Sequence, residues 1–366
     1  MKKLNVAVVG ASGFTGSEIC RLLLQHKNVK KIYPVSRERK KFSRTHPNLL
    51  AADLSYITIR ELYKISKNLD CIFLCTKSND SYDLTVKLLK ENIKIIDLSG
   101  AFRFEDIKKY KKAYGSVKMN NFLIKKKIAY GITELNRKNI LNADIIANPG
   151  CYAITALLSL APIIKKDFLD IKQPISINAI NGTTGAGNSP KIDVTHANAT
   201  ENILTYNAEG HRHAPEVEDK LQSLFNKNFL IDLNTAHGNF RRGIYLRINI
   251  NIKKKYINKV NRDLLIKIFK NFYDKKNKNN QFIQILDCKK KLKKNDKEYN
   301  LYPSVVNVVG SNNCLIGLDY DRDLGIMRII ATTDNLIKGA AGSAIQNMNI
   351  IFGCEECESL PKYGIF

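Results

Sequence analysis

Residues 4–16 read LNVAVVGASGFTG, and this stretch decides the fold class. Residues 4–9 form an apolar, β-branched run that is typical of a strand buried on both faces. A glycine-rich turn at residues 10–16 follows, and the apolar residues of segment 19–23 then share one helix face. The order of strand, glycine turn and helix predicts an α/β fold with a doubly wound parallel sheet.

The glycines of this turn have the spacing that a bound dinucleotide requires. Gly10 permits the tight turn, Gly13 lets backbone N–H groups approach a pyrophosphate, and Gly16 lets the helix pack on the strand. A simple tight connection between strand and helix is the alternative. Under the first interpretation, we expect the cofactor to contact Gly10, Ser12, Gly13, Phe14, Thr15 and Gly16.

The end of a second strand, expected at residues 31–35, indicates which dinucleotide binds. In a dinucleotide-binding fold, the residue that contacts the adenosine ribose lies about twenty residues past the last glycine, and an acidic residue there would bind both ribose hydroxyls. Ser36 and Arg37 stand there instead, followed by further cations, and Glu38 is the only acidic neighbour. This pattern suits a 2′-phosphate, so we predict NADP with Ser36 and Arg37 as ligands. The alternative is that these cations are simply solvated.

Strands and helices continue to alternate, with strands expected at residues 70–75 and 93–98 and a helix around 82–91. Ligands of doubly wound sheets bind beyond the carboxyl ends of the strands, where Ser99 to Arg103 form a loop. We expect Ser99 to contact the cofactor. Arg103 is equally compatible with an anionic ligand and with the surface.

Cys151 is the best candidate nucleophile. It stands in the stretch NPGCY, residues 148–152, between a strand expected at residues 145–147 and an apolar helix expected at residues 153–164. Unpaired N–H groups and the positive end of the helix dipole favour thiolate over thiol at this position. The alternative is a buried cysteine that acts as a small apolar side chain.

The pattern changes after about residue 171 and predicts an α+β second domain. Segments 174–180 and 243–250 alternate with period two, which indicates strands with one covered face. A helix is expected at residues 256–273, and a strand-rich run covers residues 315–332. A final helix from residue 335 to about 352 has small residues that suit packing on the first domain.

Three constellations in this second half suggest chemistry. The loop at residues 181–189 is rich in glycine and hydroxyls, which suits a phosphate cradle. The segment GHRHAPE at residues 210–216 places two histidines beside an arginine, which suits acid and base work, whereas a metal site lacks a third ligand at suitable spacing. Residues 241–243, Arg-Arg-Gly, offer an anion contact at the head of a strand.

Composition favours a cytoplasmic globular protein. The 366 residues exceed one core, the hydrophobic share is 44%, and no apolar run reaches a membrane-spanning length. Eight scattered cysteines indicate a reducing compartment, and the pair Cys354 and Cys357 lacks a second pair for zinc. The net charge of +25 comes from dispersed Lys, Asn and Ile-rich runs, which favours compositional drift over a nucleic-acid surface.

Taken together, six motifs resemble the N-acetyl-gamma-glutamyl-phosphate reductases of arginine biosynthesis, a family of semialdehyde dehydrogenases. They occur in the expected order over nearly the whole chain, at residues 10–16, 97–103, 148–152, 184–187, 211–216 and 334–341. The resemblance implies an NADP-binding Rossmann domain of residues 1–149, completed by the C-terminal helix 335–353. It also implies an α+β catalytic and dimerisation domain of residues 150–334.

The resemblance further implies a covalent mechanism. Cys151 would attack the acyl phosphate of the small-molecule substrate to give a thioester, which NADPH reduces to the semialdehyde, and His213 would act as the base. Substrate would be bound by Arg103, Tyr206, His211, Arg212 and Glu216, and the cofactor also by Gly187 and Asn335. The family implies a homodimer or homotetramer, without a metal, a nucleic acid or a membrane as partner.

The chain departs from the family pattern in two places. Ala153 and Ile154 follow Tyr152 where Pro or Ala and then Thr are usual, and Asn188 stands where Arg or Lys is common. The second departure puts in doubt a phosphate contact that Lys191 or Arg242 would have to supply. Two alternatives stay open: a lysine-pathway relative that reduces a carrier-linked acyl phosphate, and a basic nucleic-acid-binding protein on a dehydrogenase scaffold.

Overall fold

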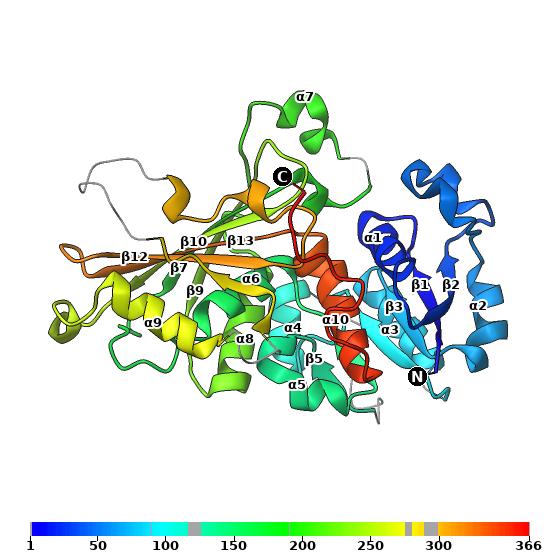
Figure 1. Ribbon diagram of the computed structural model, residues 1–366, viewed down its shortest axis with the longest axis horizontal. Helices are drawn as coiled ribbons and strands as arrows, with labels where there is room; N and C mark the ends of the chain where they lie inside the picture. Colours follow the sequence, from blue (N-terminus) through cyan, green and yellow to red (C-terminus); the bar gives the residue numbers. More distant parts are fainter. Residues whose placement is uncertain are drawn as a thin grey trace. The chain divides into compact units, whose positions relative to one another are not determined.

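In the computed structural model, the run at residues 4–9 forms β1 (Leu4–Val9), a strand whose side chains are almost all buried. It lies inside a six-stranded parallel sheet with the order β2-β1-β3-β4-β6-β5 (Figure 1). The prediction of an α/β fold with a doubly wound parallel sheet is therefore confirmed. The other strands are β2 (Val29–Val35), β3 (Cys71–Leu74), β4 (Lys94–Asp97), β5 (Ile128–Tyr130) and β6 (Ile145–Ala147).

This sheet belongs to the first of two compact units, which comprises residues 1–150 and 339–361. The second unit comprises residues 151–338 and 362–366. The structure describes residues 2–88, 90–115, 126–189, 191–274, 280–288 and 299–365. Within these residues, no helix has the length and apolar character needed to cross a bilayer.

Helices connect the parallel strands of the first unit. They are α1 (Phe14–Leu23), α2 (Ile59–Ile65), α3 (Ser78–Leu88), α4 (Ile107–Tyr114) and α5 (Thr133–Leu141). The C-terminal helix α10 (Gly342–Ile351) packs on α1 and α5 of the same unit. Polar contacts reinforce this packing: His26 Nε2 lies 2.8 Å from Asn349 Oδ1, and the Asn347 amide donates to the Gly131 carbonyl at 2.9 Å.

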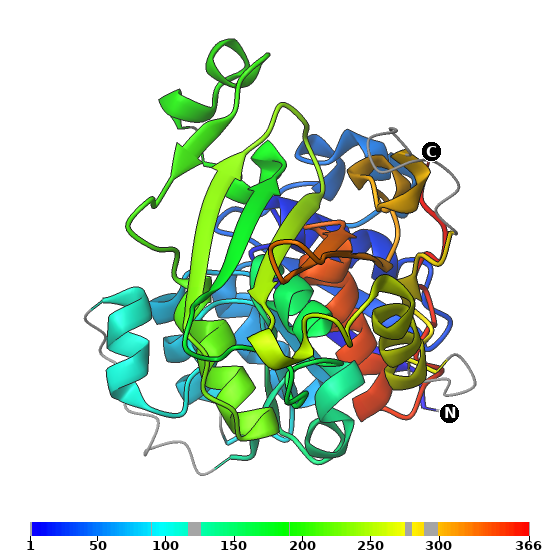
Figure 2. The same ribbon diagram turned by 90° about the vertical axis from the view of Figure 1, so that its left-hand side faces the viewer.

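The second unit contains a seven-stranded mixed sheet with the order β11-β12-β13-β10-β7-β9-β8. Its strands are β7 (Ile175–Asn181), β8 (Leu204–Tyr206), β9 (Ile231–His237), β10 (Ile244–Asn251), β11 (Ile283–Ile285), β12 (Cys314–Asp321) and β13 (Ile326–Thr333). Helices α6 (Cys151–Leu160), α8 (His213–Phe225) and α9 (Arg262–Phe272) pack on one face of this sheet (Figure 1). The segment that carries α7 (His196–Ala199) extends past the strand ends in Figure 2.

Two helices begin at residues other than those expected. The helix predicted at residues 256–273 begins only at Arg262, because the Asn261 side chain accepts a hydrogen bond from Leu264 N–H and caps it there. The apolar helix predicted at residues 153–164 begins at Cys151 and ends at Leu160. Cys151 is therefore the first residue of α6.

Candidate active site

Cys151 lies where a helix N-terminus favours a thiolate. As the first residue of α6, it sits beside backbone N–H groups that have no partner within the helix. Its carbonyl accepts the Thr155 hydroxyl at 3.0 Å, and that hydroxyl lies 2.8 Å from the Thr333 hydroxyl of β13. The sulfur is half-buried. These contacts fix the start of α6 against the sheet and leave the thiol partly accessible.

The two histidines of the GHRH segment meet the start of α6. His213 is the first residue of α8, and its ring centroid lies 5.9 Å from that of Tyr152, the residue after the cysteine. The His211 ring lies 5.4 Å from Tyr152 and 4.6 Å from His213, in edge contacts. Both imidazoles are more than nine-tenths buried. The N-termini of α6 and α8 therefore meet and gather Cys151, His211 and His213 in the second unit.

His211 is a neutral imidazole with a fixed tautomer. The backbone N–H of His213 donates to His211 Nδ1 at 3.1 Å, so the ring proton is on Nε2. Burial, and to a lesser extent the nearby charges of Arg212 and His237, lower the pKa of His211 to about 3. His211 is consequently a permanent hydrogen-bond donor at neutral pH and cannot serve as the base.

Tyr206 joins this group from β8. Its hydroxyl lies 2.9 Å from the Tyr152 hydroxyl, and its ring is in edge contact with His211 at 5.8 Å. Burial raises the pKa of Tyr206 to about 12, so the hydroxyl is protonated at neutral pH. Two of the predicted substrate residues, Tyr206 and His211, therefore lie against each other, and His211 also contacts His213.

The sequence reasoning did not identify His237, the last residue of β9. Its ring stacks on Tyr206 with a centroid distance of 4.5 Å and an angle of 18°. Period-two alternation at residues 231–235, followed by Gly238, is the signal that would have revealed this strand and its end. Without β8 and β9, nothing in the linear sequence places His237 near Tyr206.

The other two residues of the GHRHAPE segment have different environments. Arg212 is the exposed N-cap residue of α8, and Glu216 is completely buried in the first turn of that helix. Arg212 is open to a ligand. A carboxylate near a helix N-terminus is favoured by the helix dipole, which gives Glu216 a structural role in holding α8.

The glycine-rich loop at residues 181–189 does not form the phosphate cradle that its sequence suggests. The N–H groups of Thr183 and Thr184 donate to the carbonyls of Phe240 and Arg241 at 2.9 and 3.1 Å. The N–H group of Gly187 donates to the Thr184 carbonyl, and Gly187 has a positive φ of 89°. These amides are engaged within the protein and are not available to an anion.

Two residues assigned to ligands hold this loop in place. The Asn335 side chain accepts from the Gly243 N–H at 2.7 Å and donates to the Thr184 hydroxyl at 3.0 Å. The Arg242 guanidinium pairs with the buried Asp334 carboxylate at 2.9 Å. The suggested role of Arg242 in binding the substrate phosphate is therefore not supported, because its charge is already neutralised.

The glycine turn of the first unit has the geometry of a dinucleotide site. Gly10 has a φ of 80°, and a Cβ atom there would lie 2.4 Å from the Cys75 carbonyl oxygen beyond β3. A Cβ on Gly16 would lie 2.4 Å from the Gly10 carbonyl oxygen, which explains the close packing of α1 on the turn. The first N–H groups of α1, those of Phe14, Thr15 and Gly16, have no partner within the helix and are suited to a phosphate.

The cations after β2 differ in their pairing. Arg39 lies 3.5 Å from Glu61, and Lys40 lies 3.7 Å from Glu38, so both are partly neutralised. Arg37 is exposed and makes no ion pair within the described part of the chain. The Ser36 hydroxyl donates to the Glu38 carbonyl at 2.6 Å, which orders the start of this loop. Arg37 is thus an exposed cation that is available to a 2′-phosphate.

Ser99 and Arg103 are buried and engaged within the first unit. The Ser99 hydroxyl donates to the Asp97 carboxylate at 2.8 Å. The Arg103 guanidinium donates to the carbonyls of Asn148 and Leu98 at 2.9 and 3.0 Å and to the Tyr114 hydroxyl at 3.2 Å. Arg103 therefore links the loop after β4 to the loop after β6.

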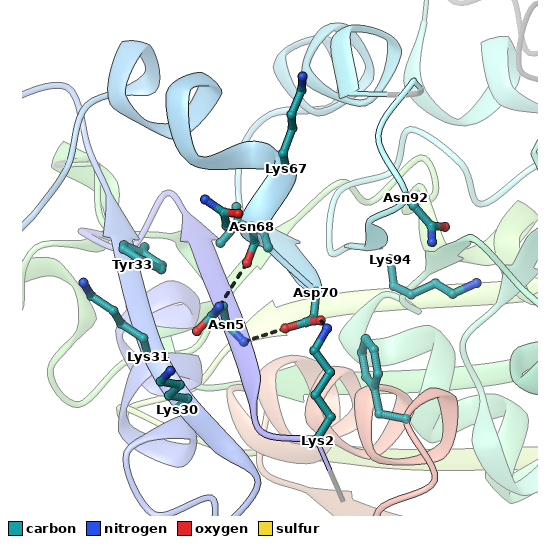
Figure 3. A pocket seen from close by; sticks show the side chains of 12 residues that line it. Lys2, Asn5, Lys30, Lys31, Tyr33, Lys67, Asn68, Asp70, Asn92 and Lys94 are labelled. Carbon is teal, nitrogen blue, oxygen red and sulfur yellow. Dashed lines mark hydrogen bonds and ion pairs between the residues drawn. The ribbon is translucent and has the colours of Figure 1, made fainter.

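A basic groove of 870 Å³ lies at the amino-terminal edge of the parallel sheet of the first unit, where β1, β3 and β4 begin (Figure 3). Asp70 binds the Asn5 N–H and the Lys2 ammonium there, at 2.8 and 2.7 Å. The groove is lined by Lys2, Asn5, Lys30, Lys31, Tyr33, Lys67, Asn68, Leu69, Asp70, Asn92, Lys94 and Phe352. This lining includes neither a cysteine nor a histidine, so the groove is not the reaction centre. No cluster of metal-ligating side chains occurs among the described residues.

Comparison with known proteins shows the family to which the whole chain is similar. The family described as "Semialdehyde dehydrogenase, NAD binding domain" matches residues 5–143, and "Semialdehyde dehydrogenase, dimerisation domain" matches residues 151–335. The chain is 32% identical to the N-acetyl-gamma-glutamyl-phosphate reductase of Thermoanaerobacter pseudethanolicus, with 99% of each chain covered. It is 33% identical to the protein of that name from Halothermothrix orenii, again with 99% of each chain covered.

Solved structures share the fold. Aspartate semialdehyde dehydrogenase II of Vibrio cholerae, complexed with ASA, superposes with a TM-score of 0.68 at 15% identity, covering 96% of this chain and 99% of that one. The aspartate semialdehyde dehydrogenase of Candida albicans, solved with NADP, gives a TM-score of 0.62 at 13% identity, covering 97% and 99%.

Proposed function

Because the chain belongs to the N-acetyl-gamma-glutamyl-phosphate reductase family of semialdehyde dehydrogenases, an oxidoreductase family with a nicotinamide cofactor, we propose that Cys151 and His213 carry its reaction. The substrate is N-acetyl-L-glutamyl 5-phosphate, and the products are N-acetyl-L-glutamate 5-semialdehyde and phosphate, in arginine biosynthesis. The observation that carries this proposal is the meeting of α6 and α8, which brings the two histidine rings to the start of the cysteine helix.

The first step uses the thiolate. Cys151 Sγ attacks the C5 carbonyl carbon of the acyl phosphate, and the bond from that carbon to the phosphate oxygen breaks. Phosphate leaves, and the acyl group stays on the sulfur as a thioester. The position of Cys151 at the start of α6 supports this step, because a helix N-terminus stabilises a thiolate.

His213 and His211 have different roles in the proton transfers and in stabilising the developing charge. His213 accepts the thiol proton before the attack and gives a proton to the oxyanion that forms when hydride adds to the thioester. It takes that proton back when the C–S bond breaks, which releases the aldehyde and the Cys151 thiolate; this is the use of a general base and acid. His211 donates its Nε2–H to the oxygen on which charge develops, and the backbone N–H of Cys151 is a second donor. A neutral donor suits this role because it keeps its proton throughout the reaction.

The cofactor is NADPH, held by an NADP-binding domain of residues 1–149 completed by residues 335–353, most of which lie in the first unit. When bound, the nicotinamide supplies the hydride that reduces the thioester. The turn residues Gly10, Ser12, Gly13, Phe14, Thr15 and Gly16 accept the pyrophosphate at the start of α1, supported by the open first amides of that helix. Ser36 and Arg37 face the 2′-phosphate, since Arg37 has no competing ion pair among the described residues.

Substrate specificity belongs to the second unit, a catalytic and dimerisation domain of residues 150–334. Tyr206, His211 and the exposed Arg212 bind the anionic substrate, while Glu216 positions α8. Asn335 and Gly187 act through the loop that they shape, and Ser99 and Arg103 act through the loops that they tie together.

The protein is a homodimer or homotetramer in the cytoplasm. The strands β7 and β10 alternate between buried residues, which face α6, and more accessible ones. The accessible face carries Asn178 and Arg247, a polar surface suited to a second copy. All eight cysteines are free, which fits a reducing compartment.

A substrate comparison tests the proposed function. The purified enzyme, given N-acetylglutamate 5-semialdehyde, phosphate and NADP, should form NADPH in a reaction that requires phosphate. The carrier-linked aminoadipate semialdehyde should give no NADPH. The opposite preference would assign the chain to the lysine-pathway alternative, and inactivity with both substrates would refute the proposed function.

A further inference from the structure

A segment between the bridged residues Lys41 and Ser55, here called the excursion, follows β2 in the first unit, beside the loop that carries Arg37. Lys41 and Ser55 form an antiparallel bridge that closes the excursion, and Val35 and Ile57 form a parallel bridge that ties its far end to β2. The base of the excursion is therefore fixed at the carboxyl edge of the sheet, where doubly wound folds bind their ligands.

His46 lies within this excursion and is held on an aromatic base. Its ring centroid lies 4.7 Å from that of Phe42, which lies 5.1 Å from that of Tyr56. Phe42 and Tyr56 are completely buried, whereas His46 is half-buried. The imidazole is thus placed by packing, with part of the ring left accessible.

His46 contacts the glycine turn directly. Its Nε2 lies 3.0 Å from the carbonyl oxygen of Ala11, the residue after Gly10. A carbonyl oxygen only accepts, so Nε2 carries the proton and donates. The contact joins the excursion to the turn that binds the cofactor phosphates, across 35 positions of sequence.

The second ring nitrogen is open. His46 Nδ1 has no hydrogen bond to any residue that the structure describes, and it is not among the side-chain atoms sealed from solvent. In the neutral ring this nitrogen carries a lone pair, which repels a phosphate oxygen. In the protonated ring it is an N–H, which donates to the same oxygen in a charge-assisted hydrogen bond.

We propose that His46 is a further residue of the dinucleotide site, which holds Ala11 through Nε2 and donates Nδ1–H to a phosphate oxygen of the bound cofactor. The inference rests on the proposed NADP function. It adds a proton to the binding reaction, because the nitrogen that faces the anion must be protonated when the cofactor arrives.

The direction of the pH effect follows from the environment of the ring. Burial lowers the pKa of His46 in the free protein, and the Ala11 carbonyl acts in the opposite direction. A phosphate at Nδ1 raises the pKa of the bound state above that of the free state. The titratable and charged side chains in the same segment as His46 include Lys41, Arg44, Asp53 and Tyr56. The cofactor affinity is therefore highest below the free pKa and falls as the pH rises through the bound pKa.

Direct NADP binding to the full chain tests the inference without turnover. The Kd is measured by calorimetry from about pH 5.5 to about pH 8, in buffers of different ionisation enthalpy that report the protons taken up. His46→Gln keeps an N–H for the Ala11 carbonyl but does not titrate. We expect it to bind within about twofold of the wild type at pH 8 and several-fold more weakly at pH 5.5.

The comparison with the variant isolates His46, because the 2′-phosphate of NADP itself titrates in this range. His196→Gln, at an exposed histidine of α7 that contacts Thr200, serves as the matched control and should behave as the wild type. Equal pH profiles and equal proton uptake in the wild type and His46→Gln would overturn the inference. A wild type that binds no NADP at any pH would contradict the proposed cofactor instead.

Discussion

The hydroxyl of Tyr152 lies 2.9 Å from the hydroxyl of Tyr206, so the residue beside the nucleophile is bonded to the edge strand β8. This bond lowers the pKa of Tyr206 and raises the pKa of Tyr152, although burial raises both more strongly. Either hydroxyl can donate in this bond, and Tyr152 is the more buried of the two residues.

Removing the Tyr206 hydroxyl should cost more stability than removing the Tyr152 hydroxyl, because Tyr152 is the more deeply buried residue. Tyr206→Phe leaves the hydroxyl of Tyr152, which is 1% exposed, without its partner, and should lower the free energy of unfolding by about 1–3 kcal/mol. Tyr152→Phe leaves the more accessible Tyr206 hydroxyl and should cost less. Urea unfolding measures both variants. Equal losses, or a larger loss for Tyr152→Phe, would show that the burial of the hydroxyl left behind does not decide the loss.

The covalent mechanism predicts that a substitution of Cys151 abolishes the reaction and leaves cofactor binding almost unchanged. Cys151→Ser should abolish the acyl-enzyme, which intact-protein mass spectrometry detects after mixing with acyl phosphate. NADPH binding, measured by the fluorescence of the nicotinamide, should stay within about twofold, because the glycine turn is in the other unit. Turnover that survives in this variant would exclude a thioester on Cys151.

The neutral His211 predicts a loss of stability in acid. The pKa of the free side chain is 6.5, and burial lowers it to about 3 in the folded protein. The unfolded chain therefore binds more protons between these values, so stability rises with pH across this window and is lost as the pH falls. His211→Asn keeps an acceptor for the His213 N–H but cannot titrate. Its unfolding free energy should depend less steeply on pH from 6.5 down to about 3, and an unchanged slope would refute the buried neutral state.

Arg37 predicts the cofactor preference. Arg37→Ala removes the cation without a competing ion pair and should weaken NADPH binding by about tenfold, because a charge-assisted contact contributes about 1.5 kcal/mol or more. NADH lacks the 2′-phosphate and should bind with unchanged affinity. Arg39→Ala is the control, since Arg39 is paired with Glu61. Equal losses for the two cofactors in Arg37→Ala would refute its role.

The elements that could be predicted from sequence were those with a strong local pattern. β1, β6 and the helix after Cys151 are buried apolar runs bounded by glycine, proline or asparagine, so their burial is visible in the linear chain. β8 and β11 have only three residues each, and their pairing depends on strands that are distant in sequence. Such short edge strands carry too few residues for a period to be recognised.

The site was predictable as far as its chemistry was local. Cys151 and His213 stand next to glycine or helix signals that mark them in the chain. His237 and His46 depend on tertiary contacts, with Tyr206 and with Ala11, that no spacing encodes. The loop at residues 181–189 shows the converse. Its glycine content indicated a phosphate cradle, but the N–H groups of Thr183 and Thr184 pair with residues 240–241, and those of Gly185 and Gly187 pair within the loop.

A substitution of Gly10 tests the role of the glycine turn, and Gly115 of the same unit serves as the control position. Gly10 and Gly115 both have a positive φ, 80° and 82°, but a Cβ on Gly10 meets the Cys75 carbonyl oxygen at 2.4 Å, whereas a Cβ on Gly115 meets no residue that the structure describes within 4 Å. Gly115→Ala should cost only the strain of a positive φ, about 1 kcal/mol. Gly10→Ala adds a clash with backbone and should cost several kcal/mol and weaken NADPH binding. Thermal unfolding and nucleotide titration of both variants measure this difference, and equal effects would show that the approach of the turn to β3 does not limit the site.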